Sequence, residues 1–314
     1  MPESSAEVIA AGINTVDFLA RPPGGVIAGG KYETDELDVQ GGGPASTASC
    51  VTAAFGHSTA FIARLGDDPV SLLSRSQFAA AGIRPDFLIH APGERVAMSM
   101  VQIDRTSGER TVYYNLSNYG WLHPEDIPVD AIRQARLIFV DGYDAPAALG
   151  MLRAARGSDC RSIIDLEHGD TGFLHECISL ATDILLPLHT ARSATGKDSP
   201  EDCLTALASL GKGQMIVTDG ERGSWALTPE GVLHQPCFPV EVVDTNGCGD
   251  AFHGGYGVGL LRGWPLSMRV EFGAWVASRV ATSLGGRRGI PDLEVARANR
   301  HCFSPALQAA LFSE

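Results

Sequence analysis

A short run in the last third of the chain, Asp244-Thr245-Asn246-Gly247-Cys248-Gly249-Asp250, combines a glycine-rich turn with a carboxylate. The β-branched segment 240–243 precedes this run, and an apolar segment rich in small residues, 250–262, follows it. The pattern predicts a strand, a turn and a helix N-terminus. Because the glycines have no Cβ, a ligand can approach the backbone N–H groups closely. Those groups and the helix dipole together form a site suited to phosphate.

Asp250 lies at the edge of this predicted anion site, in the first turn of the helix. A carboxylate there can take a proton from an attacking hydroxyl, and transfer of a phosphoryl group to an alcohol needs an anion site beside such a base. An isolated Gly-x-Gly-Asp string has a simpler interpretation, because Asp is also favoured at helix N-termini as a cap. The length of the run and a second motif favour the catalytic interpretation.

The second motif is Gly41-Gly42-Gly43-Pro44-Ala45-Ser46-Thr47-Ala48, which leads into an apolar segment that ends at Phe55. Pro44 suits the first turn of a helix, where its missing N–H costs nothing. Three glycines by themselves could form only a hinge. In front of a helix of small residues, they also let a ligand approach the backbone.

Together the two motifs resemble the signatures of the ribokinase/PfkB family of carbohydrate kinases. The first is similar to the family's Asp-Thr-x-Gly-Ala-Gly-Asp signature, with Cys248 in place of the usual alanine, and the second to its sugar-binding signature. The resemblance covers nearly the whole chain. It implies the ribokinase-like α/β fold, a doubly wound and mostly parallel sheet with helices on both faces plus a small β-sheet lid. It implies one domain over residues 1–314, with the lid inserted from about 12–40 and 96–116, and a homodimer through the lid.

The resemblance also implies that the chain transfers the γ-phosphate of ATP to a primary hydroxyl of a small-molecule sugar. Asp250 would be the general base. The anion hole would be the backbone of Asn246, Gly247, Cys248 and Gly249. The residues expected to hold the sugar are Asn14, Asp17, Gly42 and Gly43. The residues expected to contact the nucleotide are Thr218, Gly220, Gly223 and Gly286. Mg²⁺ is expected with ATP, and Asp244 would hold a monovalent cation such as K⁺.

Within the family, several strings are similar to the sulfofructose kinase group, among them Gly30-Lys31-Tyr32 and Phe252-His253-Gly254. In that group a lysine, an asparagine and an arginine grip the sulfonate. Lys31 and Asn115 fall at matching places, whereas Tyr143 stands at the place of the arginine. A tyrosine cannot replace a bidentate guanidinium, so a neutral, sulfonated or otherwise charged sugar stays open.

The chain departs from the family at the string Asn-x-x-Glu, which acts on the magnesium and phosphate network. The matching place is Leu188-His189-Thr190-Ala191. Either phosphates and water hold most of the Mg²⁺ shell, or the chain is a sugar- or nucleotide-sensing protein without turnover. A nucleoside kinase of the same fold is the other alternative, which the aromatic residues Phe18, Tyr113 and Tyr143 leave open.

Composition excludes several classes of partner. The 314-residue chain has a net charge of −13 and no basic cluster, which argues against a nucleic-acid partner. No run of about 18 apolar residues is present, and no basic leader precedes an apolar run, so we expect no membrane partner and a cytoplasmic location. The seven cysteines are scattered without a Cys-x-x-Cys pair, which is typical of reduced thiols.

The elements that must position these residues can be recognised from short apolar runs. Residues 137–140, 162–164, 184–186 and 215–218 are continuous apolar runs separated by helical stretches. Such runs predict a parallel sheet covered by helices on both faces. The remaining strand-rich segments are those assigned to the lid, 12–40 and 96–116.

Overall fold

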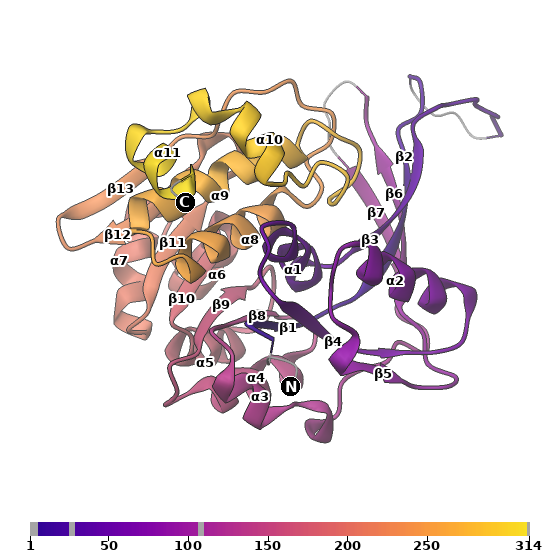
Figure 1. Cartoon of the computed structure of the whole chain (residues 1–314), viewed down its shortest axis with the longest axis horizontal. Coiled ribbons are helices and arrows are strands. Elements are labelled where there is room, and N and C mark those ends of the chain that lie inside the picture. The colour runs from indigo at the N-terminus through magenta and orange to yellow at the C-terminus, as the bar shows by residue number, and fades with distance from the viewer. Residues whose placement is uncertain (1–5, 25–28, 106–109, 313–314) are drawn as a thin grey trace.

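The computed structural model describes residues 6–24, 29–105 and 110–312, and within them a large sheet runs through the middle of the molecule (Figure 1). Its strand order is β13-β12-β11-β10-β9-β8-β1-β4-β5. The strands are β1 (Val8–Ala11), β4 (Thr59–Leu65), β5 (Leu88–His90), β8 (Leu137–Asp141), β9 (Arg161–Asp165), β10 (Asp183–Pro187), β11 (Gln214–Thr218), β12 (Ser224–Thr228) and β13 (Gly231–Gln235). All neighbours from β5 to β11 pair in parallel, and only β12 and β13 pair antiparallel at one edge.

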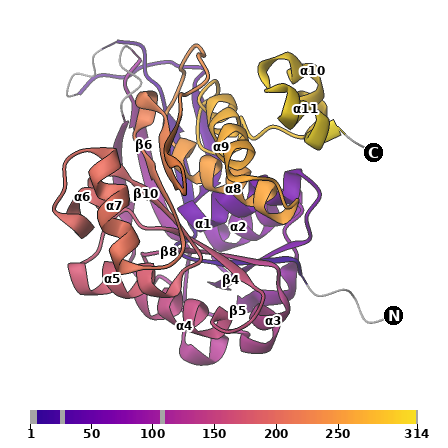
Figure 2. The ribbon, with the colours of Figure 1, turned by 90° about the vertical axis from the view of Figure 1, so that its left-hand side faces the viewer.

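Helices cover both faces of this sheet, as Figure 2 shows in side view. One face carries α3 (Val129–Gln134), α4 (Ala145–Ala155), α5 (Thr171–Leu180), α6 (Leu188–Thr195) and α7 (Pro200–Leu210). The other face carries α1 (Pro44–Ala54), α2 (Pro69–Ala80), α8 (Cys248–Leu261) and α9 (Leu266–Val280). Behind α8 and α9 pack α10 (Leu293–Ala298) and α11 (Pro305–Phe312).

The two cores follow directly from the alternation of side chains along a strand. In β1, Ile9 and Ala11 enter the core with α4 and α5, whereas Val8 and Ala10 enter the core with α1 and α8. A strand buried on both faces is apolar along most of its length, which is why the continuous apolar runs identified the central strands correctly.

A second, separate sheet stands at one end of the first (Figure 1). It has the order β3-β2-β6-β7, formed by β2 (Thr15–Ala20), β3 (Leu37–Gly42), β6 (Ala97–Ile103) and β7 (Arg110–Asn115). β2 and β6 pair in parallel, and the two outer pairs are antiparallel. The fold class predicted from the sequence is therefore confirmed: a large, mostly parallel sheet flanked by helices, with a small sheet beside it.

One predicted element is wrong. Residues 240–243 have no strand assignment, although their β-branched side chains favoured one. The edge of the large sheet is already taken by β12 and β13, and the segment instead bonds to the end of α9, where the N–H of Val243 donates to the carbonyl of Ala281 at 2.8 Å. Whether a segment pairs in a sheet depends on its tertiary contacts and is not decided by local β-propensity.

None of the helices within the described residues is both long enough and apolar enough to cross a lipid bilayer.

Candidate active site

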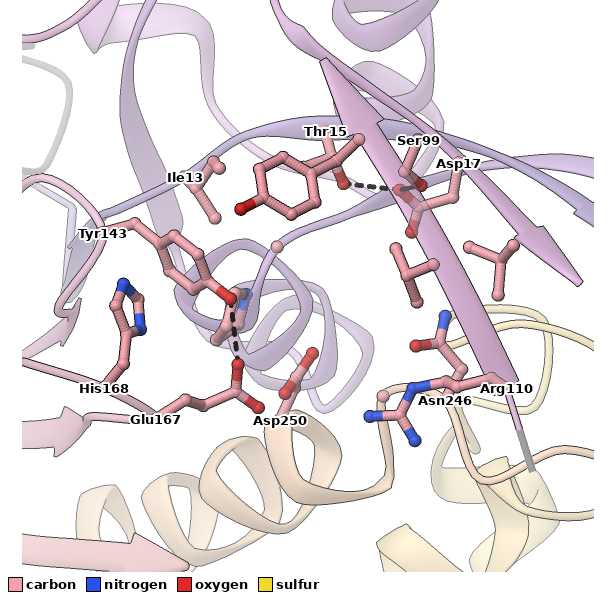
Figure 3. Close-up of a pocket in the computed structure, with 16 residues that line it drawn as sticks. Ile13, Thr15, Asp17, Ser99, Arg110, Tyr143, Glu167, His168, Asn246 and Asp250 are labelled. Carbon is pink, nitrogen blue, oxygen red and sulfur yellow. Dashed lines mark hydrogen bonds between the residues drawn. The ribbon is translucent and has the colours of Figure 1, made fainter. Parts of the chain in front are cut away.

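A cavity of about 310 Å³ lies between the small sheet and the carboxyl edge of the large one. Its wall brings together residues from β2, β6 and β7 with the loop after β8, the loop after β9 and the start of α8 (Figure 3). In an open α/β sheet, the carboxyl ends of parallel strands are where ligands bind, because the loops there converge. Of the sites predicted from the sequence, Asp17, Gly43, Tyr143, Asn246, Gly247 and Asp250 line this cavity.

The glycine-rich run forms the floor at the start of α8. Gly247 has φ of +72°, a left-handed conformation that favours glycine, and a Cβ there would lie 2.5 Å from the Cα of Gly286. The turn therefore packs backbone against backbone on the 285–289 segment. Gly286 supports the turn in this way rather than lining the cavity.

The first turn of α8 offers free amide groups. The amide of Cys248 donates to the carbonyl of Thr245 at 3.4 Å, and the amide of Ala251 donates to Gly247 at 2.8 Å. The amides of Gly249 and Asp250 lie between these two and have no acceptor within the helix, as is general for a helix N-terminus. With the positive end of the helix dipole, these amides suit an anion, and the anion site at this turn, residues 246–250, stays a prediction.

Asp250 lies in that same turn and is partly exposed to the cavity. Burial raises the pKa of Asp250 well above its ordinary value, and the charges of Asp165 and Glu167 raise it further. The positive charges of His253 and Arg110 act in the opposite direction on that pKa. A raised pKa is the property of a carboxyl group that can accept a proton during a reaction near neutral pH.

Beside Asp250 lie two residues that sequence reasoning missed, Glu167 and His168, and both contact Tyr143. The hydroxyl of Tyr143 donates to Glu167 Oε2 at 3.1 Å, and the rings of Tyr143 and His168 meet edge to face at 4.4 Å (Figure 3). Glu167 and His168 belong to a short polar string at the end of β9. The sequence feature that could have identified Glu167 and His168 is their position at the carboxyl end of a buried strand. Tyr143 follows β8 at the same edge of the sheet.

On the opposite wall, the small sheet presents hydroxyl and carboxylate groups. Asp17 Oδ1 accepts hydrogen bonds from Thr15 Oγ1 at 2.8 Å and from Ser99 Oγ at 2.7 Å. Among the described residues, no hydrogen-bond donor contacts the other carboxylate oxygen of Asp17, Oδ2, which lies close to Gly42. Gly42 therefore makes room for Asp17, whereas Gly43 lines the cavity with φ of +97°.

β7 adds Arg110, Val112 and Tyr114, which sequence reasoning also missed. These alternate residues share one face of the strand. Arg110 lies on the side of the anion turn, where its Nη1 donates to Thr245 Oγ1 at 3.4 Å (Figure 3). The cavity thus has a cationic group, Arg110, beside the turn that carries Asp250.

A buried carboxylate, Asp141, ties the loops around the cavity together. It accepts backbone hydrogen bonds from Ile13 at 3.1 Å, Tyr143 at 3.1 Å and Ala45 at 3.4 Å. Burial raises the pKa of Asp141. As the last residue of β8, it holds the start of the small sheet and of α1 against the large sheet.

Three residues predicted to hold the substrate lie outside the cavity. The carboxamide of Asn14 is buried and exchanges hydrogen bonds with Ser74 of α2, at 2.9 Å from its Nδ2. Lys31 is exposed and does not line the cavity. Asn115 is in β7, on the face opposite Arg110, and accepts a bond from the amide of Ser117 at 2.7 Å. Their substrate contacts stay predictions.

The predicted nucleotide residues form a separate turn. Thr218 ends β11, and Gly220 and Gly223 bound a short helical turn in which the amide of Asp219 donates to Gly223 at 2.9 Å. None of them lines the described cavity. They lie beyond β10 at the carboxyl edge, so a ligand that reached them would extend from the anion turn along that edge.

Asp244, the predicted cation ligand, is fully buried. Its two carboxylate oxygens accept the amides of Asn246 and Gly285, each at 2.9 Å. These bonds hold the anion turn and the 285–289 segment in register. Its role as a ligand of a monovalent cation stays a prediction.

Curated relatives of this chain are sugar kinases. A bifunctional ribokinase/ribose-5-phosphate isomerase A of Fructilactobacillus sanfranciscensis is 29% identical over 244 residues, which is 74% of this chain and 43% of that protein. This chain thus spans less than half the length of that relative. The fructokinase of Klebsiella pneumoniae is 30% identical over 243 residues, 71% of this chain and 78% of that protein.

Solved structures show the same fold. Arabidopsis thaliana ribokinase complexed with ribose and ATP has a TM-score of 0.79 at 18% identity, covering 99% of this chain and 100% of that one. A Ribokinase II of Escherichia coli in complex with ATP and Mg²⁺ has a TM-score of 0.82 at 16% identity, covering 94% and 99%. The model of the pfkB family carbohydrate kinases matches residues 6–293, nearly all of the sequence. This chain therefore belongs to the pfkB family of carbohydrate kinases.

Proposed function

We propose that this carbohydrate kinase transfers the γ-phosphate of ATP to a primary hydroxyl of an uncharged sugar. The proposal rests on one juxtaposition: the carboxyl group of Asp250 and the free amides of the first turn of α8 face one cavity whose far wall is lined with hydroxyl and carboxylate groups. A base, an anion site and a hydroxyl-binding wall are the three parts that phosphoryl transfer to a sugar needs.

The reaction follows from these positions. Asp250 takes the proton of the sugar hydroxyl as the hydroxyl oxygen attacks the γ-phosphorus, and the bond from that phosphorus to the bridging oxygen of ADP breaks. The amides of Gly249 and Asp250 donate to the phosphoryl oxygens, on which negative charge is concentrated. Arg110, on the same side of the cavity, adds a positive charge to this group. ADP leaves with the electron pair, and the proton stays on Asp250 until the product departs.

The charge of the cavity supports an uncharged sugar over an anionic one. Asp17, Glu167 and Asp250 all line the cavity, and Tyr143, which stands at the place of the arginine, donates to Glu167 at 3.1 Å. A sulfonate or phosphate placed there would be repelled by Glu167 without a bidentate arginine to hold it. Carboxylates accept hydrogen bonds from sugar hydroxyls, so the free Oδ2 of Asp17 suits a hydroxyl of the ring.

ATP and Mg²⁺ are proposed because structural relatives were solved with them. Mg²⁺ prefers oxygen ligands and keeps several waters, and Glu167 beside Asp250 can hold such waters through its carboxylate oxygens. The described residues contain no cluster of three or more His, Cys, Asp or Glu side chains that could hold a metal by themselves. A bound Mg²⁺ would offset the negative charge of the phosphates.

The outer face of the small sheet supports the proposal that the protein is a homodimer. Its outer face carries a row of neighbouring side chains from all four strands, Val39, Phe18, Met100 and Tyr113, which are 37%, 39%, 54% and 58% exposed. The alternate residues of the same strands face the cavity. A continuous apolar row on one face of a sheet suits a second copy of the same face, which would make an isologous contact.

The test is ADP release across a panel of neutral sugars, phosphorylated and sulfonated sugars and nucleosides, with Asp250→Asn beside the native protein. We expect turnover with a neutral sugar and a loss of about 10²–10⁴-fold in kcat in the variant. Turnover with nucleosides alone would assign a nucleoside kinase. ATP binding without turnover on the whole panel would favour the sensing alternative and refute the proposal.

A further inference from the structure

His253 is a buried histidine that the proposed reaction does not use. It lies in α8, three residues after Asp250, and only 1% of it is exposed. Residues three apart share one face of a helix, so His253 lies behind the base on the side of the large sheet. Histidines this deeply buried in a fold are held by specific hydrogen bonds.

Both ring nitrogens of His253 face backbone carbonyl oxygens. Nδ1 lies 2.8 Å from the carbonyl of Gly249, one turn earlier in α8, and Nε2 lies 3.1 Å from the carbonyl of Leu185 in β10. A carbonyl oxygen only accepts hydrogen bonds, so each contact needs an N–H donor. A neutral imidazole has one N–H, whereas the imidazolium has two. A neutral ring would therefore set a nitrogen lone pair against an oxygen lone pair in the interior.

The charges around the ring also favour a cation. Asp165 Oδ2, at the end of β9, lies 3.3 Å from Nδ1. Burial lowers the pKa of His253, whereas the carbonyls of Gly249 and Leu185 and the charges of Asp250 and Glu167 act to raise it. Asp141, at the end of β8, is the register partner of Asp165, so a second buried carboxylate lies next to the first. Asp165, Asp250 and Glu167 are thus the acidic side chains that lie closest to His253 among these residues.

We propose that His253 is held as the imidazolium and acts as a positioning residue for the base, tying the first turn of α8 to β10 and balancing the carboxylates behind Asp250. The bond from Nδ1 to Gly249 orients the peptide unit next to the free amides of the anion turn. The positive charge favours the ionised form of Asp250, which is the form that accepts the proton. The effect on catalysis rests on the proposed kinase function, but the protonation of the ring does not.

The protonation state is tested by NMR of the native protein with ¹⁵N-labelled histidine, without substrate. We expect the two ring nitrogens of His253 to give the similar shifts of an imidazolium throughout pH 6–8, and both N–H protons to be visible because they are buried. His253→Gln, compared with the native spectrum, assigns the signals. Two widely separated nitrogen shifts, the signature of a neutral tautomer, would overturn the proposal whether or not the protein is a kinase.

The positioning role is tested by the pH profile of kcat in His253→Gln. Loss of the positive charge raises the pKa of Asp250, so we expect the rising limb of the profile to move to higher pH by roughly one unit. At neutral pH, kcat should fall on the order of tenfold while the KM of the sugar changes little. His175→Gln is the matched control, because Nε2 of His175 bonds one carbonyl, that of Ala194 at 2.8 Å, in α5. If the rising limb of the pH profile does not move, or if only KM changes, His253 is not a positioning residue for Asp250.

Discussion

Replacement of Asp250 by Asn should make the protein less active and more stable at the same time. Burial and the charges of Asp165 and Glu167 raise the pKa of Asp250, so the folded protein keeps a proton on this group at pH values where the unfolded chain, with a carboxyl pKa of about 3.9, has lost it. Between these two pKa values the folded state binds more protons than the unfolded state, and the free energy of unfolding falls as the pH rises. The buried carboxyl group of Asp250 therefore lowers the free energy of unfolding at neutral pH, because the unfolded chain gains from ionisation and the folded protein does not.

The magnitude follows from the linkage between protonation and folding. Each unit by which the folded pKa exceeds the unfolded one is worth about 1.4 kcal/mol of unfolding free energy. In a chain of this length, 1 kcal/mol corresponds to roughly 2 °C in Tm. Asn cannot ionise, so Asp250→Asn should raise Tm at pH 8 by about 3 °C for each unit of the shift. Below pH 4 the native Asp is neutral too, and the difference should vanish.

The assay is thermal unfolding of both proteins from pH 4 to pH 8, together with ADP release at each pH where the fold is intact. Asp198→Asn, at an exposed position in the loop before α7, is the matched control and should leave Tm unchanged. If Tm of Asp250→Asn equals that of the native protein at pH 8, or differs equally at pH 4 and pH 8, the burial of this carboxyl group does not act as argued. A stable variant that keeps its kcat would refute the assignment of the base.

Three further predictions concern the turn and the small sheet. Gly247→Ala should destabilise the fold by about 1–3 kcal/mol and lower kcat. Gly263 has the same φ of +72° but open space around it, so Gly263→Ala should lower the free energy of unfolding by less, which thermal unfolding of both variants tests. Ser99→Ala removes a donor to a carboxylate in the cavity and should raise the KM of the sugar on the order of tenfold with kcat nearly unchanged; a fall in kcat alone would contradict a binding role. Met100→Lys on the outer face should convert the dimer to a monomer in light scattering, and a native protein that is already monomeric would refute the dimer.

The sequence by itself determined the elements whose signals are local. The continuous apolar runs identified β8 to β11, because the middle of a strand covered on both faces is apolar on both faces. The glycines and Asp250 identified the anion turn, because a left-handed residue and a helix N-terminus leave a short pattern in the chain. These features can be recognised from the sequence because they depend only on residues that are close together in the chain.

The tertiary structure alone decided which polar side chains face the cavity. Asn14 and Asp17 stand in one polar stretch, yet Asn14 turns to Ser74 while Asp17 lines the wall, because the chain enters β2 between them. Lys31 and Asn115 match a motif but lie outside the cavity. Asn115 does so because alternation along β7 places it on the face opposite Arg110.

The residues that sequence reasoning missed have the same explanation. Glu167 and Arg110 come from the loop after β9 and from β7, and no spacing in the chain relates them to α8. They meet Asp250 because parallel strands end at one edge of the sheet, and the small sheet folds over that edge. A strand pattern shows that two faces exist, but only the packing of the two sheets against each other decides which face meets the substrate.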